Sequence, residues 1–275
     1  MDMHEIMSTV RDLTGLSNEG DIGTSLMKRY TNMSQDRVSQ MLLTLMDEWL
    51  VKTITGTGIA TQEVALPGDV LQIMDCSRDG TPCERVPVQD KLMIGRSANH
   101  PGTSEFPAWT HEGAKAVFTP AFAGSPGTAY QIRYRKRLVP MIEGTMTYGS
   151  SSTITLSADA QPIDDIYNDY QLTLYLNTAG VKSAPQVFRI TDYVGSTKVA
   201  TVFPASVVNQ TTYGALWPLI PAEYHNILVN TTMWFLAKAG KYKGANPDEI
   251  MKTVREDIAA ELSITVPVRD RMKSE

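Results

Sequence analysis

The spacing of apolar residues changes twice along this chain, and these two changes limit the folds it can adopt. Near both ends, apolar residues recur every three or four positions, as they do on one face of an α-helix. From residue 51 to residue 205 they alternate in short runs bounded by Gly, Pro and Asp. The sequence therefore predicts an α+β fold. N- and C-terminal helices would form a bundle, and the middle an antiparallel β-sandwich with an inserted small β module.

The N-terminal region predicts three helices. The first covers residues 3–14, with an apolar face made of Met3, Ile6, Met7, Val10 and Leu13. A second is expected over 22–30. Ser34 is expected to cap a third, whose inward residues are Val38, Met41, Leu42, Leu45, Met46 and Trp49. Near the other end of the chain, Pro221 and the Asn246-Pro247 pair are expected to begin two more helices.

The middle of the chain predicts two groups of strands. The first group, which we interpret as a sheet or sandwich over 51–139, comprises VKTITGTG, QEVALP, DVLQIMDCS, KAVFTPAF and YQIRYRKRL. The second follows the crossing GTMTYGSSS and comprises STITLS, YQLTLYLN, QVFRITDY and STKVATVF. Within ITDYVGSTKVATV, residues 190–202, Gly195 and Ser196 predict the turn of a β-hairpin.

Basic residues alternate with larger apolar ones in YQIRYRKRL. One face of this strand carries Tyr130, Ile132, Tyr134 and Lys136, and the other carries Arg133, Arg135 and Arg137. The three arginines form a basic stripe. It either lies in solvent or meets an acidic protein neighbour or nucleic-acid phosphate.

These patterns predict four parts of the chain. Residues 1–143 would supply N-terminal helices and a sheet to one body, and 206–262 the helices that complete it. Residues 144–205 would form the inserted β module, and 263–275 an extended C-terminal tail.

Composition excludes several classes of protein. The chain has 275 residues and a formal net charge of −5, from 25 basic and 30 acidic residues. A general nucleic-acid clamp needs a surplus of positive charge, which is absent. No apolar run is long enough to cross a bilayer, and the acidic start does not resemble a secretion signal, so we expect folding in a cytoplasm. There Cys76 and Cys83 are expected to be reduced thiols, although a disulfide across their hairpin is conceivable.

The titratable residues do not form a pattern typical of catalysis or metal binding. His4, His100, His111 and His225 have no metal-ligand spacing, and no phosphate-binding loop or nucleophile elbow is present. We therefore expect no catalytic residues, no metal and no cofactor. Four acids, Asp159, Asp164, Asp165 and Asp169, could hold calcium, but a solvated turn is the favoured interpretation.

Residues 144–205 resemble a small β module found in virion proteins of tailed bacteriophages. The resemblance rests on the approach to STITL, the acidic run into IYNDYQLTL and above all ITDYVGSTKVATV. The family has a Gly-rich loop after its second strand, where this chain has NTAGVKSAPQ.

The rest of the chain resembles the head-to-tail adaptor (connector) proteins of tailed phages. This resemblance rests on VRDLTGLSNEGDIGTSLMKRYTNMSQDRVSQMLLTLMDEW, on YQIRYRKRL and on IPAEYHNILVNTTMWFLAKAGKYKGANPDEIMKTVREDI. In the last segment Pro221, Glu223, Tyr224 and His225 open a helix. The two resemblances together cover most of the chain.

An adaptor is a structural virion protein of the neck or tail, assembled in the cytoplasm of the host bacterium. The resemblance implies a ring, typically twelve-fold, that lies between portal and tail and lines the channel through which genomic DNA passes. The implied partners are copies of the chain itself, the portal protein, the tail nozzle or tail tube, and possible tail fibres. No membrane is implied.

The C-terminal segment grips the portal in this family. That implies a portal-docking role for Ile264, Val266, Val268, Arg269 and Arg271, the alternative being a frayed terminus.

Two other functions remain open. A lower tail component, such as a nozzle or tail-fibre attachment protein, could use the β module to bind fibres. A glycoside hydrolase would need two carboxylates at a fixed separation, and Glu223 or Asp165 could supply one but has no evident partner.

Overall fold

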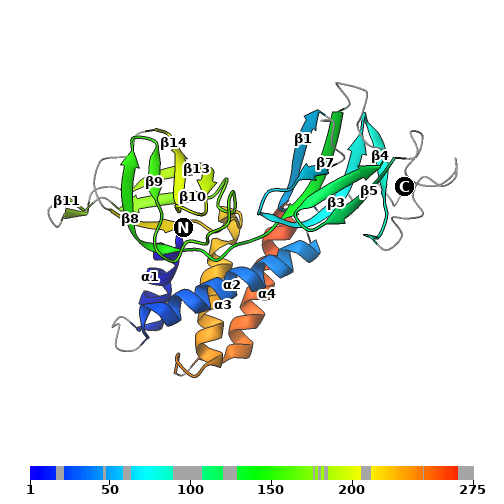
Figure 1. Ribbon diagram of the computed structural model, residues 1–275. Helices are drawn as coiled ribbons and strands as arrows, with labels where there is room; N and C mark the ends of the chain where they lie inside the picture. The colour runs from blue at the N-terminus through cyan, green and yellow to red at the C-terminus, as the bar shows by residue number, and fades with distance from the viewer. Residues whose placement is uncertain are drawn as a thin grey trace, which may run out of the picture. The chain divides into compact units, whose positions relative to one another are not determined.

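A computed structural model describes residues 1–16, 22–45, 48–57, 63–88, 107–119, 129–175, 177–178, 181–182, 185–205, 212–243 and 245–265. The chain is a mixed α+β protein (Figure 1), so this part of the prediction is confirmed. It divides into two compact units. One comprises Met1–Asp47, Val139–Pro162 and Tyr167–Glu275, and the other comprises Glu48–Leu138 and Ile163–Ile166.

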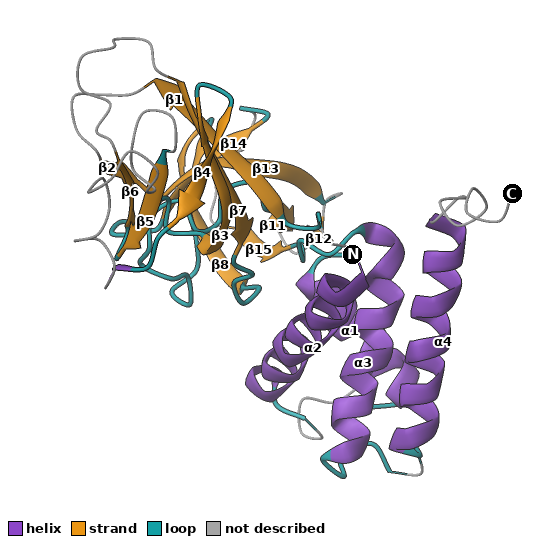
Figure 2. Cartoon of the chain, turned by 90° about the vertical axis from the view of Figure 1, so that its right-hand side faces the viewer, coloured by secondary structure: helices purple, strands orange, loops and turns teal. Residues whose placement is uncertain are grey.

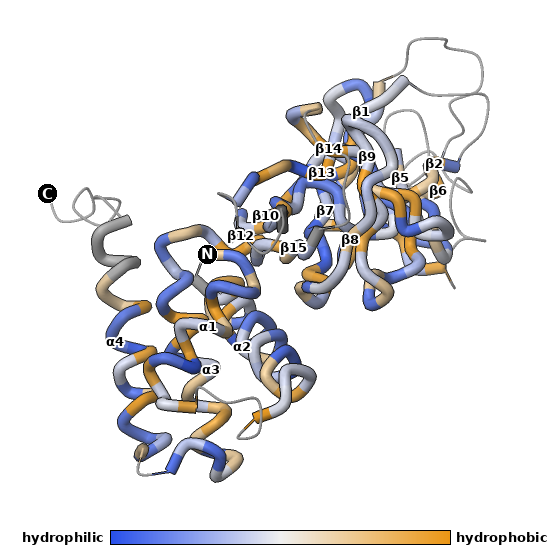
Figure 3. Tube along the Cα trace, turned by 90° about the vertical axis from the view of Figure 1, so that its left-hand side faces the viewer, coloured by the Kyte–Doolittle hydropathy of each residue, from blue (hydrophilic) through white to orange (hydrophobic). Residues whose placement is uncertain are grey.

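The first unit contains the α-helices (Figure 2). Their bounds are α1 (Met3–Thr14), α2 (Thr24–Leu45), α3 (His225–Lys238) and α4 (Pro247–Thr265), with a short 3-10 helix, η2 (Ala222–Tyr224), before α3. Helix α3 contacts α1, α2 and α4. Apolar and polar positions alternate along these helices (Figure 3), and the residues buried among them include Ile6, Val38, Leu228 and Val254.

Helix α1 has the expected bounds, but its apolar face is narrower than predicted. Asp2 caps the helix by accepting a hydrogen bond from the amide of Glu5, whose carboxylate accepts one from the amide of Asp2 in return. Gly15 ends the helix in the left-handed region, at φ 68°. Met3, Ile6, Met7 and Val10 are buried, whereas the side chain of Leu13 is 58% exposed.

Helix α2 is continuous where two helices were predicted, so the expectation that Ser34 caps a helix is wrong. Ser34 is fully buried in the middle of α2, and its hydroxyl donates to the carbonyl oxygen of Tyr30, one turn earlier, at 2.8 Å. It also accepts a hydrogen bond from the hydroxyl of Thr232 on α3 at 2.9 Å. Serine is compatible with a helix interior when its hydroxyl is satisfied in this way.

The two C-terminal helices begin near the predicted residues. Pro221 precedes η2, and α3 then starts at His225. The side chain of Asn246 accepts a hydrogen bond from the amide of Asp248 at 3.0 Å, in the first turn of α4. Helix α4 continues to Thr265, three residues into the segment 263–275 that was expected to be extended.

The second unit is built on one seven-stranded sheet. Its strands are β1 (Val51–Thr57), β2 (Glu63–Ala65), β3 (Val70–Arg78), β4 (Thr81–Arg85), β5 (Ala108–Glu112), β6 (Lys115–Thr119) and β7 (Ala129–Lys136). They are ordered β1-β7-β3-β4-β5-β6-β2, and β4 pairs with β5 in parallel. The middle is therefore a single half-barrel sheet, which corrects the expected antiparallel sandwich. Because the sheet is curved, it can bury its own apolar face. The buried residues of that face are Val64, Ile73, Cys76, Cys83, Trp109, Ala116, Phe118 and Ile132.

The two cysteines occupy directly opposed positions of β3 and β4. Both are buried free thiols. Burial raises the pKa of Cys83 to about 11 and raises that of Cys76 further. Neither side chain therefore carries the thiolate that reactive cysteines need near neutral pH.

The first unit also contains a closed six-stranded barrel. Its strands are β8 (Glu143–Ser150), β9 (Thr153–Thr155), β10 (Gln171–Tyr175), β13 (Gln186–Val194), β14 (Val199–Phe203) and β15 (Thr212–Leu216). A separate two-stranded ribbon joins β11 (Asn177–Thr178) and β12 (Val181–Lys182). The crossing expected at 144–152 is strand β8. The module expected over 144–205 ends before β15, which closes the barrel by pairing with both β8 and β10.

The hairpin predicted over 190–202 forms from β13 and β14. Val194 pairs with Val199, so the connection has four residues, Gly195–Lys198, and it is Lys198 that adopts positive φ, at 56°. Inside the barrel, the rings of Tyr167 and Tyr193 meet edge to face, with centroids 4.9 Å apart.

Candidate functional site

A row of polar side chains on α2 binds the segment that leads into the barrel. Asn32 and Gln35 lie one and two turns after Lys28. The Lys28 ammonium donates to the carbonyl of Glu143 at 3.0 Å, and the side-chain amide of Gln35 donates to that of Val139 at 2.9 Å. Between them, Asn32 binds both polar main-chain groups of Met141. The extended segment 139–143 is thus hydrogen-bonded along its length to one helix face.

Glu143 is the buried charge of this region. Its side chain is only 1% exposed, and its carboxylate lies 3.7 Å from the Lys28 ammonium and 3.5 Å from Nδ1 of His4. Coulombic repulsion by Glu143 adds to burial in raising the pKa of Tyr213. Lys28 and His4 belong to helices and Glu143 begins the barrel, so this cluster joins the helices to the barrel. Removing a charged partner from a buried carboxylate is strongly destabilising.

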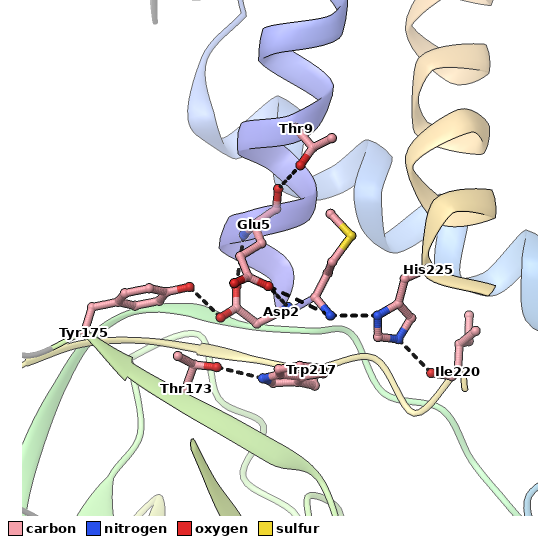
Figure 4. Close-up of polar contacts among 9 residues, drawn as sticks. Asp2, Glu5, Thr9, Thr173, Tyr175, Trp217, Ile220 and His225 are labelled. Carbon is pink, nitrogen blue, oxygen red and sulfur yellow. Dashed lines mark hydrogen bonds and ion pairs between the residues drawn. The ribbon is translucent and has the colours of Figure 1, made fainter. Parts of the chain in front are cut away.

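A second set of polar contacts surrounds the start of α1 (Figure 4). The hydroxyl of Tyr175, on β10, donates to the carboxylate of Asp2 at 2.5 Å, and Asp2 is fully buried. Burial, and then the hydrogen bond to Asp2, raise the pKa of Tyr175. Asp2 therefore caps α1 and also binds the barrel.

His225 links the start of α3 to the same region. Its Nε2 lies 2.9 Å from the carbonyl oxygen of Ile220 and its Nδ1 lies 2.8 Å from the amine of Met1 (Figure 4), so the neutral ring donates from Nε2 and accepts at Nδ1. Burial lowers the pKa of His225, and the hydrogen bond to Ile220 opposes that shift only in part. The ring is therefore a structural hydrogen-bonding group in its neutral form.

A groove of about 420 Å³ lies beside these contacts, between α1, η2, α3 and α4. Leu13 and Thr9 line it from α1, and Glu223 lines it from η2. Asn230 and Asp257 also line it, and the side-chain amide of Asn230 donates to the carboxylate of Asp257 at 3.1 Å. Glu223 and Asp257 both lie on this groove, but its described lining residues include no cluster of acid, base and nucleophile typical of an active site.

Two arginines of the predicted basic stripe, Arg133 and Arg135, lie on the outer face of β7, as their alternation indicated, and Arg137 directly follows that strand. Ile132, Tyr134 and Lys136 are buried, whereas Arg133 and Arg135 are half-buried and Arg137 is exposed. The guanidinium of Arg133 lies 3.1 Å from the carboxylate of Asp75 on the neighbouring strand β3.

Two β-bulges in β3 add apolar side chains to this face. The register between β3 and β7 shifts at Leu71 and again at Met74, and their side chains are 51% and 39% exposed. The residues next to them, Gln72 and Asp75, pair with Arg135 and Arg133. Bulges of this kind re-aim side chains and are common beside functional surfaces. We call the set Leu71, Met74, Arg133, Arg135 and Arg137 the arginine face.

Some of the other predicted site residues lie in the described part of the structure, and others lie outside it. Ile264 lies in the last turn of α4, whereas Val266, Val268, Arg269 and Arg271 lie outside the described residues. Asp159 forms an ion pair with Lys28 at 3.8 Å, and Asp169 forms one with Arg189. Asp164 and Asp165 belong to the other unit.

Over the described ranges, no group of His, Cys, Asp and Glu could hold a metal ion. No described helix is both long enough and apolar enough to span a bilayer.

Sequence reasoning missed the polar row on α2 and both bulged side chains. Lys28, Asn32 and Gln35 have the spacing of one helix face, which is a detectable signal, but nothing in the sequence identifies main-chain carbonyls as their partners. The bulges have no sequence signal, because Leu71 and Met74 are ordinary strand residues.

Comparison with known proteins finds no family model that matches the chain and no curated protein that matches it.

Proposed function

We propose that this chain is a structural virion protein, a head-to-tail adaptor that forms a ring between the portal and the tail of a bacteriophage. The observation that carries the proposal is the arginine face. Arg133, Arg135 and Arg137 lie beside exposed Leu71 and Met74 on a chain whose net charge is −5. Arginine and methionine are enriched at protein interfaces, and a basic apolar face complements acidic surfaces of further copies.

In this proposal each subunit uses two different faces to contact its two neighbours, which is how a closed ring forms. The arginine face supplies one of them. The N- and C-terminal helices act as one bundle that builds the ring wall, which is supported by the contacts of α3 with α1, α2 and α4. The segment after α4 docks on the portal, and genomic DNA passes through the channel. The protein acts in the neck or tail of the virion without catalysing a reaction.

Assembly tests this proposal directly. We expect the full chain, mixed with the portal protein encoded by the same genome, to form rings that are visible by negative-stain electron microscopy and have a discrete mass in native mass spectrometry. The double variant Arg133→Glu, Arg137→Glu should reduce ring formation at least tenfold, because two attractive contacts become repulsive.

The matched control reverses the same number of charges elsewhere. Lys115 and Arg189 are exposed, lie outside the helices and form ion pairs with Glu63 and Asp169, so Lys115→Glu, Arg189→Glu should assemble normally. A chain that stays monomeric with portal, or rings that are indifferent to the arginine face, would contradict the proposal.

One observation favours a second candidate, a lower tail component that binds fibres. The Phe203 side chain is 66% exposed on the barrel, and Val187 on the neighbouring strand is also exposed. Gold labelling of intact particles distinguishes the two functions, because the neck and the distal tail are far apart. Label at the distal tail, together with loss of fibres in Phe203→Ser, would support the second.

A further inference from the structure

Lys136 and Asp69 form a buried pair in the sheet unit. Their side chains are 1% and 3% exposed, and Nζ of Lys136 lies 3.4 Å from Oδ2 of Asp69. Lys136 is on β7, and Asp69 immediately precedes β3, the strand paired with β7. A fully buried lysine is rare, and this one belongs neither to the arginine face nor to the contacts of the barrel.

The main chain fixes the two residues relative to each other. Val70 pairs with Lys136, and the amide of Arg137 donates to the carbonyl oxygen of Asp69 at 2.6 Å. The strand pairing and this hydrogen bond therefore hold the backbone of Lys136 beside that of Asp69. The geometry keeps the amine and the carboxyl group together without a search through conformations, which is the main requirement for a reaction between them.

Tyr134 completes the cluster. Its hydroxyl donates to Oδ1 of Asp69, the oxygen that does not face Lys136, at 3.2 Å. Burial, followed by the charge of Asp69, raises the pKa of Tyr134, so the phenol stays protonated and remains a donor. A donor at this oxygen is placed to stabilise negative charge that develops there.

The surroundings shift Lys136 toward its neutral amine. Burial, and then the positive charge of Lys52, lower the pKa of Lys136 to about 8, although Asp69 opposes the shift. An uncharged lysine amine is a nucleophile, and a neighbouring cation together with burial is a known way to produce one.

We propose that Lys136 and Asp69 condense into an amide, which cross-links β7 to the start of β3. A proton first passes from the ammonium to the carboxylate and gives a neutral amine and a carboxylic acid. Nζ then attacks Cγ of Asp69, and the hydrogen bond from Tyr134 stabilises the charge on Oδ1. The Cγ–Oδ2 bond breaks, and Oδ2 leaves as water with the carboxyl proton and one proton from Nζ. The step needs no oxidant, reductant or cofactor.

The cross-link would close the chain between residues 69 and 136 covalently. It would remove conformational freedom from the unfolded state, as a disulfide does, and no reducing agent would break it. This inference is independent of the proposed function, because it concerns the interior of one sheet.

Mass spectrometry of the purified, denatured full chain tests the proposal. We expect a mass lower than the sequence mass by one water. Protease digestion should yield a branched peptide that joins the segments around Asp69 and Lys136. The branched peptide is essential, because a cyclic imide at Asp79-Gly80 would lose the same mass.

Four variants sharpen the test. Lys136→Arg keeps the positive charge but should retain the full sequence mass, whereas the matched control Lys115→Arg, at an exposed position of the same unit, should still lose water. Asp69→Asn should lose ammonia in place of water. Tyr134→Phe should form the cross-link at least tenfold more slowly after refolding. A wild-type chain that keeps its sequence mass after prolonged incubation at pH 9 overturns the proposal, and so does a water loss that persists in Lys136→Arg.

Discussion

The side-chain amide of Asn32 exchanges two hydrogen bonds with the main chain of Met141. Its Nδ2 donates to the Met141 carbonyl at 3.1 Å, and its Oδ1 accepts from the Met141 amide at 2.8 Å. The pairing resembles that between neighbouring strands, with a helix side chain in place of the second strand. One residue of α2 therefore satisfies both polar main-chain groups of a residue more than a hundred positions away.

Replacing Asn32 by Ala should lower the free energy of unfolding by about 2–4 kcal/mol, since two main-chain groups lose their partners. Urea denaturation followed by circular dichroism measures this. Gln40→Ala, at an exposed position of the same helix, should change the stability by less than about 0.5 kcal/mol. Equal effects of the two substitutions would show that the hydrogen bonds to Met141 contribute nothing.

Residues of α1 should differ sharply in their tolerance of substitution. Ile6→Ala removes a fully buried side chain and should cost about 2–5 kcal/mol. Leu13→Ala should stay within about 0.5 kcal/mol of the parent, because that side chain is largely in solvent. Thermal and urea unfolding of the two variants check this. A large loss for Leu13→Ala in the isolated chain would mean that its surface is covered in solution.

The stability of the protein should fall as the pH is lowered through His225. The unfolded imidazole has a pKa of about 6.5. Burial lowers the pKa of His225 in the folded chain. Below about pH 6.5 the unfolded chain therefore binds more protons than the folded chain, and the free energy of unfolding falls. The charged groups that act on the ring are the Met1 amine and Glu223. The expected slope reaches at most about 1.4 kcal/mol per pH unit.

His225→Gln should remove this contribution, whereas His111→Gln, at an exposed position, should leave it in place. Urea titrations at several values between pH 5 and pH 8 give the slopes. If the parent and His225→Gln have the same slope, another group controls the acid sensitivity.

A side chain added at Gly214 should destabilise the barrel, because the space around this residue is filled. A Cβ atom there would lie 2.5 Å from Sδ of Met146 and 2.9 Å from Cδ2 of Leu174. We expect Gly214→Ala to cost about 1–3 kcal/mol through overpacking. Gly23→Ala is the control, since no described residue lies within 4 Å of its added atom. Adding Met146→Ala should relieve the clash, so that the double variant loses less than the sum of the two single losses.

Periodicity predicted the elements whose partners are local. The spacing in residues 3–14 determined α1, and strict alternation assigned Ile132 and Arg133 to opposite faces of β7. The same reasoning failed where distant contacts decide the outcome. Alternation shows that one side of a strand is dry, but a second sheet and the curvature of the same sheet can both cover that side. For this reason the half-barrel was predicted as a sandwich.

Strand β15 shows a second limit of sequence reasoning. Its residues pair with β8 and β10, far away in the sequence, and no local turn indicates a barrel closed by a last strand. Only part of the candidate site could be predicted from the sequence. The basic stripe was evident because its three arginines alternate along one short stretch of sequence, whereas Leu71 and Met74 reach the same face only through bulges.

The first and last strands of the barrel, β8 and β15, are hydrogen-bonded neighbours, with Glu143 opposite Ala215. The chain thus enters and leaves the barrel within about 5 Å, the spacing of adjacent strands. A short turn could bridge that gap. The whole barrel could therefore be exchanged or deleted as a cassette, which would change the surface that the molecule presents and preserve the order of the elements on either side, β7 and η2.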